Sequence, residues 1–380
     1  MNFKLKPILF SSLLAISTSL TYAHSDEHHN LPEASQSGVQ MTTSATALIN
    51  NLTKEQQDTL VYKFIDDANR TYWTNAPVDS QARNGLPIGR LSIEQRVLLH
   101  KLLISSTSSQ GYQKIWGAVR GDDELKWEGE ERELDSEKFF NKNQSLGANN
   151  YWVSFYGDPR IEKNWGFMIT GHHLAANFTV VDGQATFVPM FYGSDPAFIS
   201  HGAQAGHVFL AQERNRGLEL IQSFTEKQQS IAVISETIPM NKYGPTDFLG
   251  PGKKDKIIEK RGISADQLSD EQQILLWVLI KEYINNADFD VAEAQLEKIE
   301  DDGLSKIRFM WMGPTDGSEQ IFFRVSSPSI LIDFVDQRTG FDWNTHPHTI
   351  VRDPSNDYGE NWLDRHIDES HTRGVRPIKE

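Results

Sequence analysis

The stretch that decides the fold lies near the middle of the chain, where residues 171–193 read GHHLAANFTVVDGQATFVPMFYG. Runs of β-branched and aromatic residues flank Asp182-Gly183, a dipeptide that tolerates the positive φ angles of a tight turn. The stretch therefore predicts a β-hairpin. We expect its first strand to carry two adjacent histidines, His172 and His173.

A second strand-like run carries the other close pair of histidines in a folded segment. Residues 345–353 read THPHTIVRD and include His346 and His348. Because its apolar residues are β-branched, this run also favours a strand. We expect the fold to bring these two runs together.

The remaining elements predict an α+β protein. Strand patterns occupy residues 151–156, 165–169, 307–312, 320–325 and 330–335, whereas helical patterns occupy about 45–69, 92–104, 108–119, 206–224, 264–286 and 292–299. Ser92 with Gln95 three residues on is a capping-box signal for a helix start. Segregated blocks joined by short turns favour a large antiparallel β-sheet region packed with helices in a single main domain, residues 46–380. No internal repeat is evident in the sequence.

The first residues predict export. Lys4 and Lys6 precede a short apolar run, and small residues end at Ala23, so residues 1–23 have the pattern of a secretory signal peptide that is too short to span a membrane. We expect a periplasmic or secreted protein without membrane insertion after signal cleavage. The formal charge of −15 argues against nucleic-acid binding, and the absence of cysteine excludes a thiolate metal site or a cysteine nucleophile.

Residues 24–45 contain His24, His28 and His29 followed by a Ser/Thr/Gln-rich run with few large apolar residues. This composition predicts a disordered, solvated tail. Copper chelation through an amino-terminal His24 is the alternative interpretation, and the role of the three histidines stays open.

The two histidine pairs point to a metal site. Side chains alternate along a strand, so His346, His348 and Arg352 are expected on one face, with the two imidazoles about 7 Å apart. The same alternation places His173 on the opposite face of its strand from His172. Three imidazoles with an open position suit catalytic zinc, copper or iron, so the predicted cofactor is a divalent transition metal whose identity the ligand types leave open.

Further candidates complete this hypothesis. The predicted metal ligands are His172, His173, His346, His348 and His366. Glu213 is a candidate general base, Arg352 could orient an anionic substrate group, and Asp353 could support a ligand.

Other interpretations of the same histidines remain. They could form a metal-free polar pocket, or they could be structural histidines that hydrogen-bond to backbone carbonyls, since no His-Glu-x-x-His motif occurs. On the metal-site interpretation, we expect a metal-dependent hydrolytic or oxidative enzyme with a small-molecule substrate. A periplasmic protein that binds a metal or small ligand without catalysis is the alternative, and a structural or partner-binding protein is a third.

A family resemblance spans roughly residues 50–370. It rests on the following motifs: Trp165-Gly166-Phe167, Gly171-His172-His173-Leu174, Phe191-Tyr192-Gly193, Phe309-Met310-Trp311-Met312-Gly313 and His346-Pro347-His348-Thr349-Ile350-Val351-Arg352-Asp353-Pro354-Ser355-Asn356-Asp357-Tyr358-Gly359. With these motifs the chain resembles the bacterial and fungal family named domain of unknown function 3500. Pro347 departs from the apolar β-branched residue expected there and suggests an edge strand or a strand start. The resemblance implies no reaction.

Overall fold

The computed structural model describes residues 36–65, 67–78, 80–131, 145–241, 244–251, 260–338 and 345–363, all within one compact unit, Glu33–Glu380. The predicted signal peptide, the histidines of the tail and His366 lie outside the described residues. Among the helices of this part of the chain, none is both long and apolar enough to cross a bilayer.

One large sheet organises the described residues. Its main path runs β1-β3-β4-β5-β7-β15-β14-β13-β12-β11, while β2, β6 and β8 pair with β3, β5 and β12. All neighbours are antiparallel except β1 with β3 and β8 with β12. The strands are β1 (Val61–Tyr62), β2 (Leu86–Pro87), β3 (Trp152–Tyr156), β4 (Trp165–Gly171), β5 (Leu174–Val181), β6 (Gln184–Thr186), β7 (Met190–Gly193), β8 (Val233–Ser235), β11 (Ile263–Ser264), β12 (Arg308–Met312), β13 (Phe322–Ser326), β14 (Leu331–Arg338) and β15 (Thr345–Arg352). A separate two-stranded sheet joins β9 (Met240–Asn241) to β10 (Gly244–Pro245).

Four of the α-helices of the described residues begin at capping boxes that the sequence provides. The α-helices are α1 (Gln36–Asn51), α2 (Lys54–Leu60), α3 (Asp67–Arg70), α4 (Ile93–Ile104), α5 (Ser109–Glu131), α7 (Ala211–Gln222), α8 (Glu226–Ala232), α9 (Asp270–Ile284) and α10 (Phe289–Asp302). Capping boxes start α2, α4, α8 and α9 at Thr53, Ser92, Thr225 and Ser269. The predicted α+β architecture with a large, mainly antiparallel sheet is confirmed.

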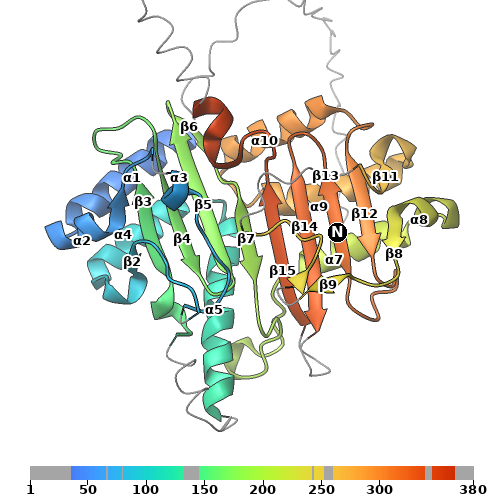
Figure 1. Cartoon of the computed structure of the whole chain (residues 1–380), viewed down its shortest axis with the longest axis horizontal. Helices are drawn as coiled ribbons and strands as arrows, with labels where there is room; N and C mark the ends of the chain where they lie inside the picture. Colours follow the sequence, from blue (N-terminus) through green and yellow to red (C-terminus); the bar gives the residue numbers. More distant parts are fainter. Residues whose placement is uncertain are drawn as a thin grey trace, which may run out of the picture. The chain divides into compact units, whose positions relative to one another are not determined.

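The same order of helices and strands occurs in both halves of the chain. In the first half, α2, β1, β2, α4 and α5 precede β3, β4, β5 and β7; in the second, α8, β8, β11, α9 and α10 precede β12, β13, β14 and β15 (Figure 1). The pairings also correspond, since β1 is parallel to β3 as β8 is to β12, and β2 is antiparallel to β3 as β11 is to β12. No internal repeat was expected from the sequence, whereas in the structure the elements and their pairings recur, and the same Thr-to-Gln and Ser-to-Gln capping boxes start α2 and α8, and α4 and α9.

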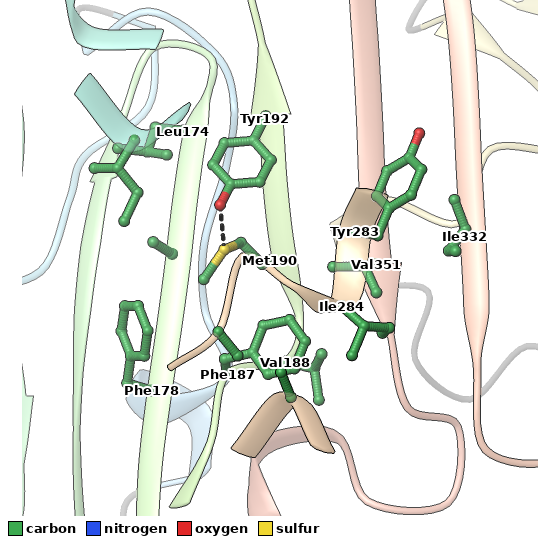
Figure 2. Close-up of a cluster of buried hydrophobic side chains, with 14 of the residues drawn as sticks. Leu174, Phe178, Phe187, Val188, Met190, Tyr192, Tyr283, Ile284, Ile332 and Val351 are labelled. Atoms are coloured by element: carbon green, nitrogen blue, oxygen red, sulfur yellow. Dashed lines mark hydrogen bonds between the residues drawn. The ribbon is translucent and has the colours of Figure 1, made fainter. Parts of the chain in front are cut away.

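The halves meet within the sheet and also between their helical segments. The last strands of the two halves, β7 and β15, pair antiparallel in the middle of the sheet. The segments that follow α4 and α9 form a bridge between Thr107 and Ala287. Figure 2 shows the apolar packing at this junction, where Met190 and Tyr192 lie near Val351 and Tyr283. Continuous packing across β7 and β15 makes the halves one folded unit.

Both faces of the sheet are buried. The larger hydrophobic cluster joins one face to α1, α4, α5, α7, α9 and α10. A smaller cluster on the other face includes Phe191, Phe248, Ile350 and Tyr358. Strand alternation along β15 agrees with this division, because Ile350 belongs to the smaller cluster and Val351 to the larger one.

The predicted tail is too long. Helix α1 begins at Gln36, and its residues Met41 and Ala45 are buried in the larger cluster. The folded domain therefore starts at least ten residues before the predicted residue 46. Small and polar residues such as Ser37 and Gly38 are buried in α1 as well, which is why composition alone resembled a solvated tail.

Candidate metal centre

The two adjacent histidines form a turn and do not lie on a strand as predicted. Gly171 of β4 pairs with Leu174 of β5, so His172 and His173 are the two connecting residues. His173 adopts a φ of 65°. Its backbone is held on both sides, because Gly193 N donates to His173 O at 2.8 Å and His173 N donates to Asn75 O at 3.3 Å. Strand alternation does not apply across a turn, so the prediction that His172 and His173 lie on opposite faces of a strand is wrong.

His346 and His348 lie near the start of β15. They share the face of Ile350, whereas the Thr349 hydroxyl contacts Tyr283 of α9 on the opposite face. Pro347 lies close to the start of β15, which agrees with the predicted strand start. The alternative prediction of an edge strand is wrong, because β15 is an interior strand between β14 and β7. The predicted placement of both imidazoles on one face agrees with the structure.

Gly193 of β7 allows the rings to approach. It pairs with His348, and a Cβ atom at this position would lie 2.7 Å from His348 Cδ2 and 3.1 Å from His173 Cδ2. Both separations are shorter than ordinary van der Waals contact. The absence of a side chain at Gly193 therefore makes room for two of the histidines.

Three imidazoles converge at this place. One ligand nitrogen from each of His173, His346 and His348 lies within 4.8 Å of the others. Nε2 of His346 is 2.8 Å from Nε2 of His173. Nε2 of His348 is buried and has no hydrogen-bond partner among the described residues. A buried polar atom without a partner costs free energy, so this nitrogen requires a ligand that the surrounding side chains do not supply.

The electrostatics keep the three rings neutral. Burial lowers the pKa of His173 and of His348 well below the usual 6.5, and the neighbouring histidines lower both pKa values further. Burial also lowers the pKa of His346, while the Asp195 carboxylate acts in the opposite direction. Neutral imidazole is the form that binds a metal ion, so all three side chains are ready ligands at neutral pH.

Asp195 is a carboxylate beside the triad. Its Oδ2 lies 3.8 Å from Nδ1 of His346, on the side of the ring away from His173. Metal-binding histidines commonly direct their second nitrogen toward a carboxylate, which fixes the ring orientation. Sequence reasoning missed Asp195, because nothing in the local sequence links it to residue 346.

His172 occupies a different environment from its neighbour. Its Nδ1 lies 2.6 Å from Oδ1 of Asp122 on α5, and its ring centroid lies 3.7 Å from that of His173. The Tyr151 hydroxyl donates to His172 O. His172 therefore packs beside the triad and anchors the turn to α5, and it does not belong to the group of three converging nitrogens.

The structure does not bring the predicted catalytic residues to the triad. Arg352 donates to Asp357 at 2.7 Å and lies four residues beyond His348, about 13 Å along the strand. Asp353 forms an ion pair with Lys298. Glu213 is buried on α7, where its Oε1 lies 2.7 Å from Nζ of Lys114.

Fold and site together define a class of protein: an α+β protein of two similarly built halves, with a histidine cluster where the halves meet. The chain belongs to the family described as protein of unknown function (DUF3500), whose family model matches residues 34–360. This match confirms the family resemblance seen in the sequence. Neither the curated proteins nor the solved structures contain a match to the chain.

Proposed function

We propose that the protein is an exported metal-dependent enzyme whose centre is formed by His173, His346 and His348. The observation that carries the proposal is the convergence of three neutral imidazoles, one with a buried nitrogen that has no partner among the described residues. Structural histidines would be expected to satisfy such nitrogens with backbone carbonyls.

The donor set fits a divalent transition metal. Imidazole suits zinc, copper and iron, and an ion held by three of them with an open position can act as a Lewis acid or a redox centre. Ligand nitrogens around a tetrahedral ion with bonds of ~2.0 Å are about 3.3 Å apart, so the 2.8 Å contact between His346 and His173 has to lengthen slightly. The His346 side chain is 17% exposed, which leaves it room to adjust.

The surrounding residues would position the ligands and limit access of water. The backbone contacts of His173 fix its turn, and Asp195 would orient His346. The rings of Phe191 and Phe248 have centroids 5.4 Å and 6.5 Å from that of His348. These two aromatic rings beside His348 favour binding of a small organic substrate at the site. The hydrolytic or oxidative reaction would take place at the open coordination position.

A binding protein without catalysis is the second candidate. The observation that favours it is that Glu213, Arg352 and Asp353 form ion pairs elsewhere, whereas Asp195 lies beside the triad. A periplasmic metal or small-ligand carrier needs ligands but no acid or base.

The first experiment is elemental analysis of the untagged protein purified from the periplasm or medium without chelator. Four forms are compared: the wild type, a variant without residues 24–35, the double variant H346N/H348N and the control H207N, which changes an exposed histidine outside the triad. We expect about one equivalent of metal in every form except the double variant. Metal that persists in the double variant, or that disappears with residues 24–35, would contradict the proposed centre.

A second measurement separates the two candidate functions. The cobalt- or copper-loaded protein is titrated with azide while its visible absorption is recorded. A spectral change that saturates with azide indicates an open coordination position and supports an enzyme. A spectrum that azide does not change indicates ligands that saturate the ion and supports the binding protein.

A further inference from the structure

A cavity of about 880 Å³ lies on the helical side of the sheet, where the two halves meet. Helix α5 of the first half lines it together with α7 and Glu282 of α9, and the segment after β7 forms another wall. Ligand sites of 300–1,000 Å³ are common at such junctions. The size and place of this cavity are therefore suited to a small molecule.

The ammonium group among the described residues that line the cavity, that of Lys114, is surrounded by acceptors. Nζ of Lys114 donates to Glu282 Oε1 at 2.8 Å and to Glu282 O at 2.9 Å, and it lies 2.7 Å from Glu213 Oε1. Three acceptors thus surround an ammonium that has three protons. This cluster joins α5, α7 and α9, and two carboxyl groups face its single ammonium, so Lys114 is not the group that selects an anionic ligand.

Two arginines that line the cavity are less well satisfied. Arg120 is exposed and forms no ion pair with any described residue. Nε of Arg216 is buried without an acceptor among the described residues, and its Nη1 is 3.4 Å from Glu219 in an exposed pair. Exposed pairs of this kind contribute little. A chain with a formal charge of −15 therefore has a cavity with cationic groups that lack strong partners.

The remaining walls are partly apolar. Ile199, Phe209 and Leu210 line the cavity, and Phe209 and Leu210 are buried in the larger hydrophobic cluster. We propose that this cavity binds a small organic carboxylate, with its anionic group on Arg120 and Arg216 and its apolar body against these walls. Guanidinium groups bind carboxylates through paired hydrogen bonds, so the arginines suit the anionic end of such a ligand. The apolar walls suit its other end.

This site is distinct from the histidine centre, although the two share a segment. Ser194 and Pro196 line the cavity, while the carboxylate of Asp195 between them lies near His346. The proposal does not depend on metal binding, so it can be tested whatever the metal content proves to be.

The test is calorimetric titration of the full chain with four matched probes: hexanoate, hexanamide, hexylamine and inorganic phosphate. The variants are R120Q and R216Q, with R90Q as a control at an exposed arginine outside the cavity. We expect hexanoate to bind and the other three probes to bind roughly 10-fold more weakly or not at all, because only hexanoate has both a carboxylate and an apolar body. R120Q and R216Q should each weaken hexanoate binding by about 10-fold, and R90Q should not.

Several results would overturn the proposal. These are no binding of hexanoate, tighter binding of hexylamine, binding of phosphate as tight as that of hexanoate, or equal affinity in the wild type, R120Q and R216Q. The H346N/H348N variant separates this proposal from the metal centre. It should bind hexanoate like the wild type, and loss of binding there would place the anion at the histidines instead.

Discussion

The turn between β4 and β5 and the turn between β13 and β14 occupy corresponding places in the two halves. In the first, His172 and His173 connect Gly171 to Leu174; in the second, Pro328 and Ser329 connect Ser327 to Ile330, whose carbonyl accepts a bond from Ser327 N. Each turn is anchored by an acid from the second helix of its helical pair. Asp122 of α5 contacts His172, and Asp302 of α10 accepts from both Ser327 and Ser329.

The comparison separates what the fold requires from what the site requires. An acid that anchors the turn is present in both halves, so it belongs to the architecture. The histidine pair at the turn is present in the first half alone, since Pro328 and Ser329 of the second half supply no counterpart to its imidazoles, so the pair belongs to the candidate site. Function here depends on side chains placed on a repeated framework rather than on the framework itself.

The largest expected effect comes from changing the two corresponding turn residues. H173N keeps a residue type that tolerates positive φ but removes one of three ligands, so metal content should fall from about one equivalent to near none. S329A should leave metal content unchanged and lower the free energy of unfolding by about 1 kcal/mol. Elemental analysis and urea unfolding measure both effects; loss of metal in S329A would remove the distinction between the turns.

The pH dependence of stability should follow from the three histidines that meet where the halves join, one from the first half and two from the second. Because burial lowers the pKa values of His173, His346 and His348, the unfolded chain binds more protons than the folded chain below pH 6.5. The free energy of unfolding of the metal-free protein should therefore fall as pH decreases below 6.5, by up to ~1.4 kcal/mol per pH unit for each histidine. Unfolding of H346N/H348N from pH 7.5 to 5.5 should show a shallower slope, and an unchanged slope would argue against this cause.

Removal of the anchoring acids tests whether the metal centre depends on its anchor. D122A leaves the donor groups of Gly147 and His172 without their acceptor, so it should cost about 2–4 kcal/mol of stability. It should also weaken metal binding about 10-fold, because the His172 ring supports that of His173. D302A should cost about 1–3 kcal/mol and leave metal affinity unchanged. Metal titration monitored by fluorescence distinguishes the two variants, and equal metal affinities would show that Asp122 is only structural.

The smallest difference between the halves is expected for the two glutamines of the capping boxes, Gln95 and Gln272. Gln95 completes the capping box of α4 and bonds Gln56 and Asn51 O; Gln272 completes that of α9 and bonds Gln228 and Ser223 O. Q95A and Q272A should each cost about 1–2 kcal/mol, agree within ~0.5 kcal/mol and add in the double variant. Thermal and urea unfolding provide the values, and a large difference would show that the halves are built less alike than their bonds indicate.

The sequence by itself determined the local elements. Ser92 with Gln95 marks a helix start, the Asp182-Gly183 turn joins β5 to β6, and alternation places His346 and His348 on one face of β15. Each of these features depends on residues that are neighbours in the chain, where propensity, caps and period are sufficient.

Only the tertiary structure decided how distant residues meet. His173 and His346 are 173 residues apart, and they come together because β7 pairs with β15, while Gly193 leaves room for the rings of His173 and His348. The turn at His172-His173 looks like part of a strand when read locally, and the contacts of Asp122 and Asp195 join separate elements. Such pairings are set by burying both faces of a large sheet, a long-range free energy that no short stretch of sequence contains.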